Sequence, residues 1–289
     1  MNTSVPTHRQ ELWKYRYLLY NLVVRDLKVR YKNSILGVLW SLLNPLLIMV
    51  VFTLVFQRFS AGNIYVFPIF VLVGIIPWNF FSGGVMGGTH GILGNAQLIK
   101  KVYFPRIILP TATILSNSIN FLIALIVLLV MLFVFGIGLT RHALWVPFIF
   151  IAQLLLMLGV VYILSAAQVF VRDVAMILEV ALLALFFLSP IFYTLDSFCN
   201  TTMLGITFDP GRVMRWINPM ASIIDAYRTV LWGTLTYPVE TCAQQISHYS
   251  PPSGMGLDFI ARTFITSLLI FIFGYLFFRR VESRFGELL

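Results

Sequence analysis

The sequence is poor in charged residues. Asp, Glu, Lys and Arg make up 11% of its 289 residues, whereas 59% are hydrophobic. Soluble domains have about a quarter of their residues charged, so this chain has too few to cover a water-facing surface. We therefore expect most of the chain to be dissolved in lipid.

Recognisable catalytic motifs are also missing. The sequence contains neither the phosphate-binding pattern G-x-x-x-x-G-K-[ST] nor the nucleophile pattern G-x-S-x-G. Its four histidines, at positions 8, 90, 142 and 248, are widely separated, and none has metal-ligand spacing. The sequence therefore predicts no enzymatic activity, no metal and no cofactor in this chain.

The charged residues that do occur separate long apolar segments. The first segment, residues 35–56, has 22 residues and no charged side chain. At about 1.5 Å per residue, a helix of this length spans roughly the 30 Å hydrocarbon core of a bilayer. Five further apolar segments follow, at residues 65–81, 107–135, 144–170, 174–193 and 259–278. We predict an all-α integral membrane protein with six transmembrane helices.

Basic residues orient these spans. The first span follows an arm that contains Arg25, Lys28, Arg30 and Lys32, and 14 of the 20 Lys and Arg residues fall on the same side of the predicted topology. Because basic loops stay in the cytoplasm, we place both termini there. This asymmetry accounts for the net charge of +9 without a nucleic-acid partner. No cleavable signal peptide is visible, so the first span is expected to start insertion.

Residues 11–32 are predicted to form an amphipathic helix that lies in the membrane interface. Its polar residues fall on one stripe at about 100° per residue, opposite an apolar face. Asp26 and Arg30 interrupt the apolar face, but their spacing of four residues, with the acid first, allows them to pair. An ordinary solvated basic helix is the alternative interpretation.

Two connecting segments differ in character. Residues 83–98 are rich in glycine but lack the phosphate-loop pattern, so we expect the glycines to allow close packing between helices. Residues 194–258 are the largest external feature, and residues 219–235 within them fit short re-entrant helices that dip into the outer leaflet. Cys199 and Cys242 both lie there, where a disulfide is allowed; two unpaired thiols are the alternative.

Ionisable residues are nearly absent inside the predicted spans. The first four contain no Asp, Glu, Lys or Arg, and Glu179 lies only about two turns inside the fifth. Ion-driven carriers and intramembrane enzymes need ionisable groups at depth. The sequence therefore argues against both of these classes.

Several stretches, spread over almost the whole chain in the same order, resemble the type-2 ABC transporter permeases that export polysaccharides or polyol phosphates. The resemblance begins with V-R-D-L-K-V-R-Y-K at residues 24–32, S-I-L-G-V-L-W at 34–40 and Asn44-Pro45. It continues with L-I-K-K-V-Y-F-P-R at 98–106, V-F-V-R-D-V at 169–174, and Asn218-Pro219 together with Arg228. Residues 1–289 would then form a single transmembrane domain.

The resemblance implies several partners. Two copies would form a conduit, and a separate ABC ATPase subunit would bind ATP and Mg and dock on the cytoplasmic side. Residues 95–104 would be the coupling helix, with contacts from Gln97, Leu98, Lys100, Lys101, Val102, Tyr103 and Phe104. The alternative is that Lys100 and Lys101 only set the membrane topology.

The resemblance also implies a lipid-linked glycan substrate, such as O antigen, capsule or teichoic acid, in a bacterial inner or plasma membrane. By charge, Arg16, Arg25 and Arg30 are candidates for binding its headgroup, although anionic bilayer lipid could occupy them equally. The aromatic candidates for lining a conduit are Trp40, Phe52, Phe56, Tyr65, Phe187, Phe192 and Tyr193; the default for any of them is lipid contact. A permease for drug or small-lipid efflux is the alternative function.

Overall fold

The structure is a computed structural model. It describes residues 15–32, 34, 37, 39–56, 66–102, 104–139, 141–193, 201–203, 206–208, 210–232, 238–240, 246–248 and 257–285. The helices are α2 (Arg16–Tyr31), α3 (Leu39–Phe56), α4 (Phe67–Thr89), α5 (Ala96–Lys101), α6 (Ile108–Val134), α7 (Val146–Phe170), α8 (Val174–Leu188), α9 (Pro210–Ile217), α10 (Pro219–Leu231) and α11 (Leu257–Val281). Short 3₁₀ turns occur at Leu93–Asn95, Arg141–Trp145 and Glu282–Arg284.

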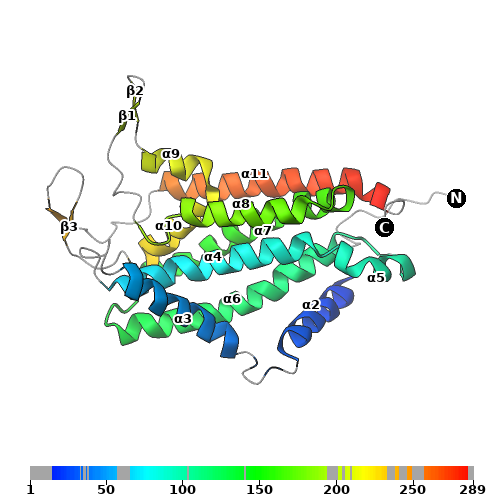
Figure 1. Ribbon diagram of the computed structural model, residues 1–289, viewed down its shortest axis with the longest axis horizontal. Coiled ribbons are helices and arrows are strands. Elements are labelled where there is room, and N and C mark those ends of the chain that lie inside the picture. The colour runs from blue at the N-terminus through cyan, green and yellow to red at the C-terminus, as the bar shows by residue number, and fades with distance from the viewer. Residues whose placement is uncertain are drawn as a thin grey trace.

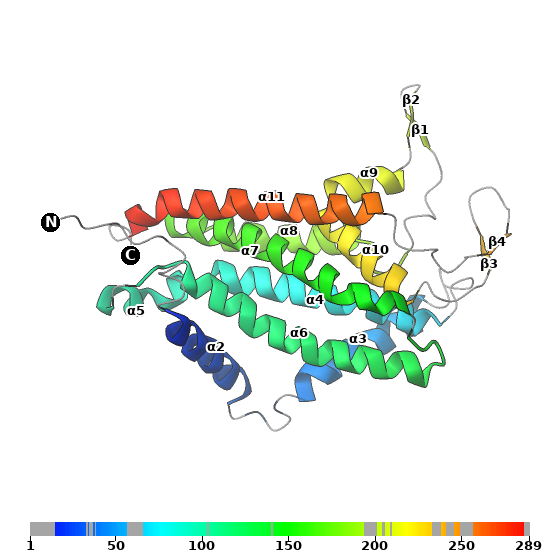
Figure 2. The same ribbon diagram turned by 180° about the vertical axis from the view of Figure 1, so that it is seen from behind.

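Helices α4, α6, α7, α8 and α11 run side by side as an elongated bundle (Figures 1 and 2). Helix α5 and the C-terminal end of α11 lie at one end, which we call the α5 end. Helices α9 and α10 and two short hairpins lie at the opposite end, the hairpin end. Helices α2 and α3 lie against one side of the bundle, beside α6.

Six apolar helices match the six predicted spans in order, and among the residues that the structure describes, four helices are long and apolar enough to cross a membrane. These are Phe67–Thr89, Ile108–Val134, Arg141–Phe170 and Ala261–Arg284. Helix α3 has 18 residues and α8 has 15, which correspond to about 27 Å and 23 Å of rise. Six crossings therefore stay a prediction.

The predicted second span was too short. Helix α4 does not end at residue 81 but continues to Thr89, through Gly83, Gly84, Gly87 and Gly88. Glycine lowers intrinsic helix propensity by about 1 kcal/mol per residue, but here the segment packs against α6 and α7. Tertiary packing therefore sustains a helix that local propensity opposes.

The expected role of the glycines in close helix packing is confirmed at two positions. A Cβ atom on Gly88 would lie 2.6 Å from Val161 Cγ1 of α7, and one on Gly84 would clash with the Met157 side chain. An equally close approach that the sequence analysis missed joins α7 to α11, where Gly159 faces Gly274 backbone to backbone. Helix α7 is therefore fixed between two neighbours.

The predicted all-α fold class is confirmed, and two short hairpins add to it within residues 194–258. Two antiparallel hairpins occur there, β1 (Thr201–Met203) with β2 (Ile206–Phe208), and β3 (Pro238–Glu240) with β4 (Ile246–His248). In a segment that falls outside the helix bundle, short strands can pair locally. Cys199 and Cys242 lie outside the described residues.

The helix predicted within residues 219–235 is α10, and it is largely buried. Its Asn218 cap accepts hydrogen bonds from the backbone N–H groups of Met220 (3.0 Å) and Ala221 (3.3 Å). It packs against α4, α7 and α11 at the hairpin end. Whether it enters the outer leaflet stays a prediction.

Candidate substrate and coupling sites

Helix α2 is held to α6 by two polar contacts at its C-terminal end. Arg30 Nη2 donates to Asn117 Oδ1 over 3.0 Å, and the Tyr31 hydroxyl donates to Asn120 Oδ1 over 2.5 Å. The predicted pairing of Arg30 with Asp26 is therefore wrong: Asp26 pairs with its neighbour Arg25, with 2.8 Å between Arg25 Nη2 and Asp26 Oδ1. Arg30 is long enough to reach α6, a partner 87 residues away that the local sequence does not reveal.

Polar and apolar side chains are only weakly separated onto opposite faces of α2, contrary to the expectation of an amphipathic helix. Leu22 and Val23 are buried against the bundle, whereas Tyr17, Tyr20 and Val29 are exposed among the basic residues. Apolar side chains therefore occur on both sides of the helix, and its interfacial location stays a prediction. Residues 11–14 lie outside the described part of the chain.

A polar cavity lies where α2, α3, α4 and α6 meet. Its volume is about 170 Å³, and its lining is Arg30, Asn44, Pro45, Ile76, Asn79, Phe80, Asn117, Asn120 and Ala124. The lining includes four amides and one guanidinium, and no carboxylate is among these residues. We call it the amide pocket.

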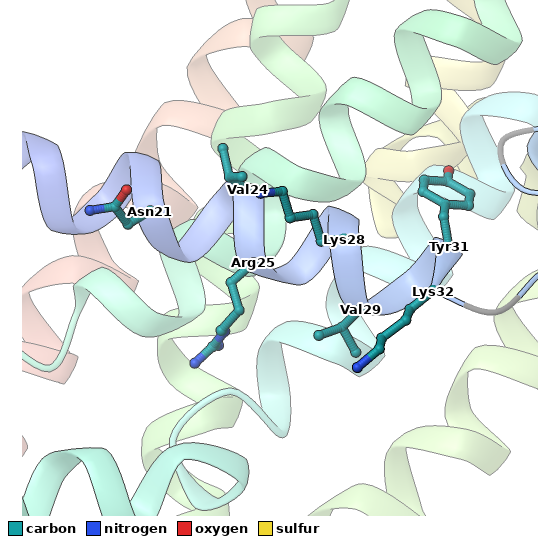
Figure 3. A pocket seen from close by; sticks show the side chains of 7 residues that line it. All are labelled: Asn21, Val24, Arg25, Lys28, Val29, Tyr31 and Lys32. Atoms are coloured by element: carbon teal, nitrogen blue, oxygen red, sulfur yellow. The ribbon is translucent and has the colours of Figure 1, made fainter.

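A second, wider hollow of about 800 Å³ follows α2 itself (Figure 3). All of its lining residues belong to that helix and the residue after it: Asn21, Val24, Arg25, Lys28, Val29, Tyr31 and Lys32. Figure 3 shows Arg25, Val29 and Lys32 pointing to one side of the helix and Lys28 to the other. This hollow is an open surface along one helix and not an enclosed site.

The three arginines predicted to bind a headgroup do not share one site. Arg25 lies in the open hollow beside Asp26, and Arg30 lines the amide pocket. Arg16 lies near the other end of α2, where its Nη2 is 3.4 Å from the Tyr17 hydroxyl and its guanidinium is 5.0 Å from the Tyr17 ring centre. Their roles stay predictions, and only Arg30 lies in a pocket formed by several helices.

The predicted coupling residues lie at the α5 end. Gln97, Lys100, Lys101 and Val102 are exposed, and Leu98 is half-buried. Phe104 is only 5% exposed, so it packs in the core, and Tyr103 lies outside the described residues. The exposed part of the set forms a short basic surface around the last turn of α5.

A contact that the sequence did not reveal connects this end to the C-terminal helix. The Arg106 backbone N–H donates to Glu282 Oε1 over 2.7 Å, and Arg106 Nη1 donates to the Glu282 carbonyl over 2.5 Å. Arg279 Nη1 adds an ion pair to Glu282 Oε2 at 3.4 Å. The segment that follows α5 is thereby fastened to the end of α11.

Arg228 is the central residue of the hairpin end. It is 4% exposed, and its Nη1 and Nη2 donate to the carbonyls of Tyr193 and Ile191, each over 3.0 Å. Its guanidinium also lies 3.5 Å from the centre of the Phe70 ring, within the range of a cation–π interaction. Arg228 therefore fixes the turn after α8 against α4 and α10.

The aromatic candidates fall into two groups. Phe52 of α3 stacks on Phe192, with 4.2 Å between ring centres, and Phe186 lies 5.3 Å from Phe192. Trp40 and Phe187 are exposed, and the Tyr193 hydroxyl donates to the Phe187 carbonyl over 3.2 Å. Tyr65 and the side chain of Phe56 lie outside the described residues. Within the described set, Trp40 and Phe187 expose the largest ring surfaces.

Among the described residues, no group of three or more His, Cys, Asp or Glu side chains could hold a metal ion. The arrangement is instead that of several long apolar helices, a polar pocket between them and a basic surface at one end. These features define a multi-pass integral membrane protein.

Comparison with known proteins gives the family. The ABC-2 type transporter family matches residues 17–232, so the chain belongs to this family of transport subunits. It is 37% identical over 223 residues to the O-antigen export system permease protein RfbA of Myxococcus xanthus, a match that covers 77% of this chain and 83% of that protein. An O-antigen export system permease protein RfbA of Klebsiella pneumoniae is 30% identical over 278 residues, which cover 94% of this chain and 96% of the relative.

Proposed function

We propose that this protein is the membrane-spanning permease subunit of an ATP-driven exporter for a lipid-linked O-antigen polysaccharide. The observation that carries the proposal is the match of nearly the whole chain to O-antigen export permeases. The substrate would pass from the cytoplasmic side to the outer side of a bacterial inner membrane. The polymer would leave with its lipid still in the bilayer.

A separate ABC ATPase subunit would bind ATP and Mg and supply the energy. The exposed residues of α5 support docking at the α5 end, because a short helix with Lys100 and Lys101 on its last turn presents positive charge to a partner. The Arg106–Glu282 contact would pass movement of this end to α11.

Charge reversal tests this docking. Lys100→Glu combined with Lys101→Glu is expected to abolish stimulation of the partner's ATPase by the permease. Reversal of Arg141, an exposed residue in the turn before α7, is the matched control and should leave stimulation unchanged. If the double variant still stimulates the ATPase fully, the two lysines only set topology.

Two copies of the chain, each with six spans and cytoplasmic termini, would form the conduit. Helices α3 and α8 support this arrangement because both are short, apolar and extensively exposed in the single chain. Glu179 is exposed on α8 beside Met176 and Val180. A carboxylate on a membrane helix normally faces protein or a water-filled path, so this face would border the conduit or the second copy.

Exposed aromatic rings would give the sugar chain weak, repeated contacts along this path. Trp40 on α3 and Phe187 on α8 are the described candidates with the largest exposed fractions. Weak contacts at several positions allow a polymer to move, whereas one tight site would hold it.

Deletion of the gene tests the function directly. Lipid-linked glycans of the cytoplasmic leaflet are separated from those at the cell surface and compared with the parent strain. We expect finished O antigen to accumulate inside while the surface loses it. Unchanged surface glycan with increased drug sensitivity would instead assign the protein to small-molecule efflux.

A further inference from the structure

The amide pocket carries a positive charge that no lining residue neutralises. Arg30 contacts the neutral amide of Asn117, while the nearby acid, Asp26, is paired with Arg25. A guanidinium has five N–H donors, and the structure assigns one of Arg30's to Asn117 Oδ1. The site therefore retains both positive charge and donor capacity at its edge.

The amides of α6 that line this site leave a second donor without a partner. Asn117 Nδ2 donates to the Thr113 carbonyl over 2.9 Å, which turns its Oδ1 toward Arg30. Asn120 Oδ1 accepts from Tyr31, which leaves Asn120 Nδ2 buried and without a hydrogen-bond partner in the described part of the chain. A buried donor without a partner costs about 1–3 kcal/mol, so a ligand acceptor there would recover that free energy.

The size of the pocket restricts its ligand. Its volume of about 170 Å³ is below the roughly 300 Å³ of the smallest typical small-molecule pockets. It can hold a headgroup but not a length of glycan. Pro45, Ile76, Phe80 and Ala124 supply apolar walls beside the polar groups, as a group attached to an acyl or prenyl chain requires.

We infer that the amide pocket binds the phosphoryl headgroup of a membrane lipid. Arg30 supplies the charge, since guanidinium groups match phosphate oxygens in geometry. Asn120 supplies a neutral donor, and Asn44 and Asn79 line the remaining polar wall. If the proposed export function holds, on which the identity of this lipid rests, the headgroup is the diphosphate of the lipid-linked glycan; an anionic bilayer lipid has the same chemistry.

Lipid binding to the purified full-length chain in nanodiscs tests the site. The probes are a polyprenyl diphosphate and, in a separate arm, phosphatidylglycerol, with bound lipid counted by native mass spectrometry. Arg30→Gln should lower the affinity for polyprenyl diphosphate about tenfold, because a charge-assisted hydrogen bond is lost. Asn120→Asp keeps an acceptor for Tyr31 but replaces the donor with an anionic oxygen, and should lower the affinity at least as much.

Each variant has a matched control on α2. Lys28→Gln removes the same charge as Arg30→Gln, and Asn21→Asp adds the same charge as Asn120→Asp; both positions are exposed and outside the amide pocket. The controls should change the affinity by less than about twofold, as expected for screened surface charges. Arg30→Lys keeps the charge but loses the planar guanidinium with its paired N–H donors. Its lipid affinity should lie between those of the wild type and Arg30→Gln. Equal losses in variants and controls, or no loss in either variant, would overturn the inference.

The two lipid arms identify the source of the headgroup. A loss confined to polyprenyl diphosphate assigns the pocket to the export substrate, whereas parallel losses for both lipids assign it to any phosphoryl lipid. The proposed function fails separately, if gene deletion leaves surface O antigen unchanged. If gene deletion removes surface O antigen as expected but lipid binding is unaltered in both pocket variants, the site is rejected and the function is kept.

Discussion

Arg228 and Arg30 each reach from one helix to another element, but in different surroundings. Arg228 is buried at the hairpin end, where two carbonyls and the Phe70 ring surround it. Arg30 is exposed at the end of α2, where it contacts one amide beside a cavity. A buried charge must be compensated by the fold, whereas a charge at a cavity can be compensated by a ligand. The contrast separates an arginine that stabilises the structure from one available for binding.

The largest expected effect is at the buried arginine. Arg228→Met should lower the free energy of unfolding by about 2–4 kcal/mol, because the carbonyls of Ile191 and Tyr193 lose their charged donor. Unfolding of the purified protein in detergent, followed by tryptophan fluorescence, measures it. Arg172→Met, at an exposed turn, is the control. Equal losses of stability at Arg228 and Arg172 would show that the buried contacts of Arg228 do not stabilise the fold.

A smaller effect is expected from the glycine beside Arg228. A Cβ on Gly74 would lie 3.2 Å from Arg228 Nη2 and 3.3 Å from the Ile191 Cα, so Gly74→Ala should destabilise by about 1 kcal/mol. Gly83→Ala is the matched control in the same helix, because nothing lies within 4 Å of its added Cβ. That control should be neutral or slightly stabilising through helix propensity. The same denaturation assay distinguishes a decrease in the free energy of unfolding for Gly74→Ala from an unchanged or slightly increased value for Gly83→Ala.

The smallest effect on stability is expected at Arg30. A double-mutant cycle with Arg30→Gln and Asn117→Leu should give a coupling free energy of less than about 1 kcal/mol, because the pair is open to solvent screening. Measured in the same assay, a coupling as large as the loss in Arg228→Met would make Arg30 a structural residue. Arg30 and Arg228 would then both be arginines that stabilise the fold.

Patterns of apolar runs and basic loops predicted much of the fold. All six apolar segments became helices in the predicted order, and residues 95–104 contain the short basic helix α5. These features depend on the requirement that backbone groups in lipid form hydrogen bonds within their own segment. Helix α4 extends beyond the predicted end at residue 81 because its glycines pack against α6 and α7. Local helix propensity does not reveal this tertiary contact.

The sites were predicted less completely. Charge alone selected Arg16, Arg25 and Arg30 as equivalent candidates, but the structure separates them. Asn79 was not proposed, since a single amide in an apolar run carries no recognisable spacing. Asn120 was not proposed either, although it lies in a polar cluster with Ser116, Asn117 and Ser118 inside the third predicted span. The structure shows that Asn117 and Asn120 of this cluster contact α2.

The sequence by itself determined that this protein lies in a membrane and to which family it belongs. Those properties follow from local composition and ordered motifs, which tertiary contacts do not alter. Only the tertiary structure decided that Arg228 is enclosed, that Arg106 joins Glu282 and that Arg30 lies at an amide pocket. Each of these depends on residues distant in the chain, whose proximity is fixed by helix packing through positions such as Gly88 and Gly159.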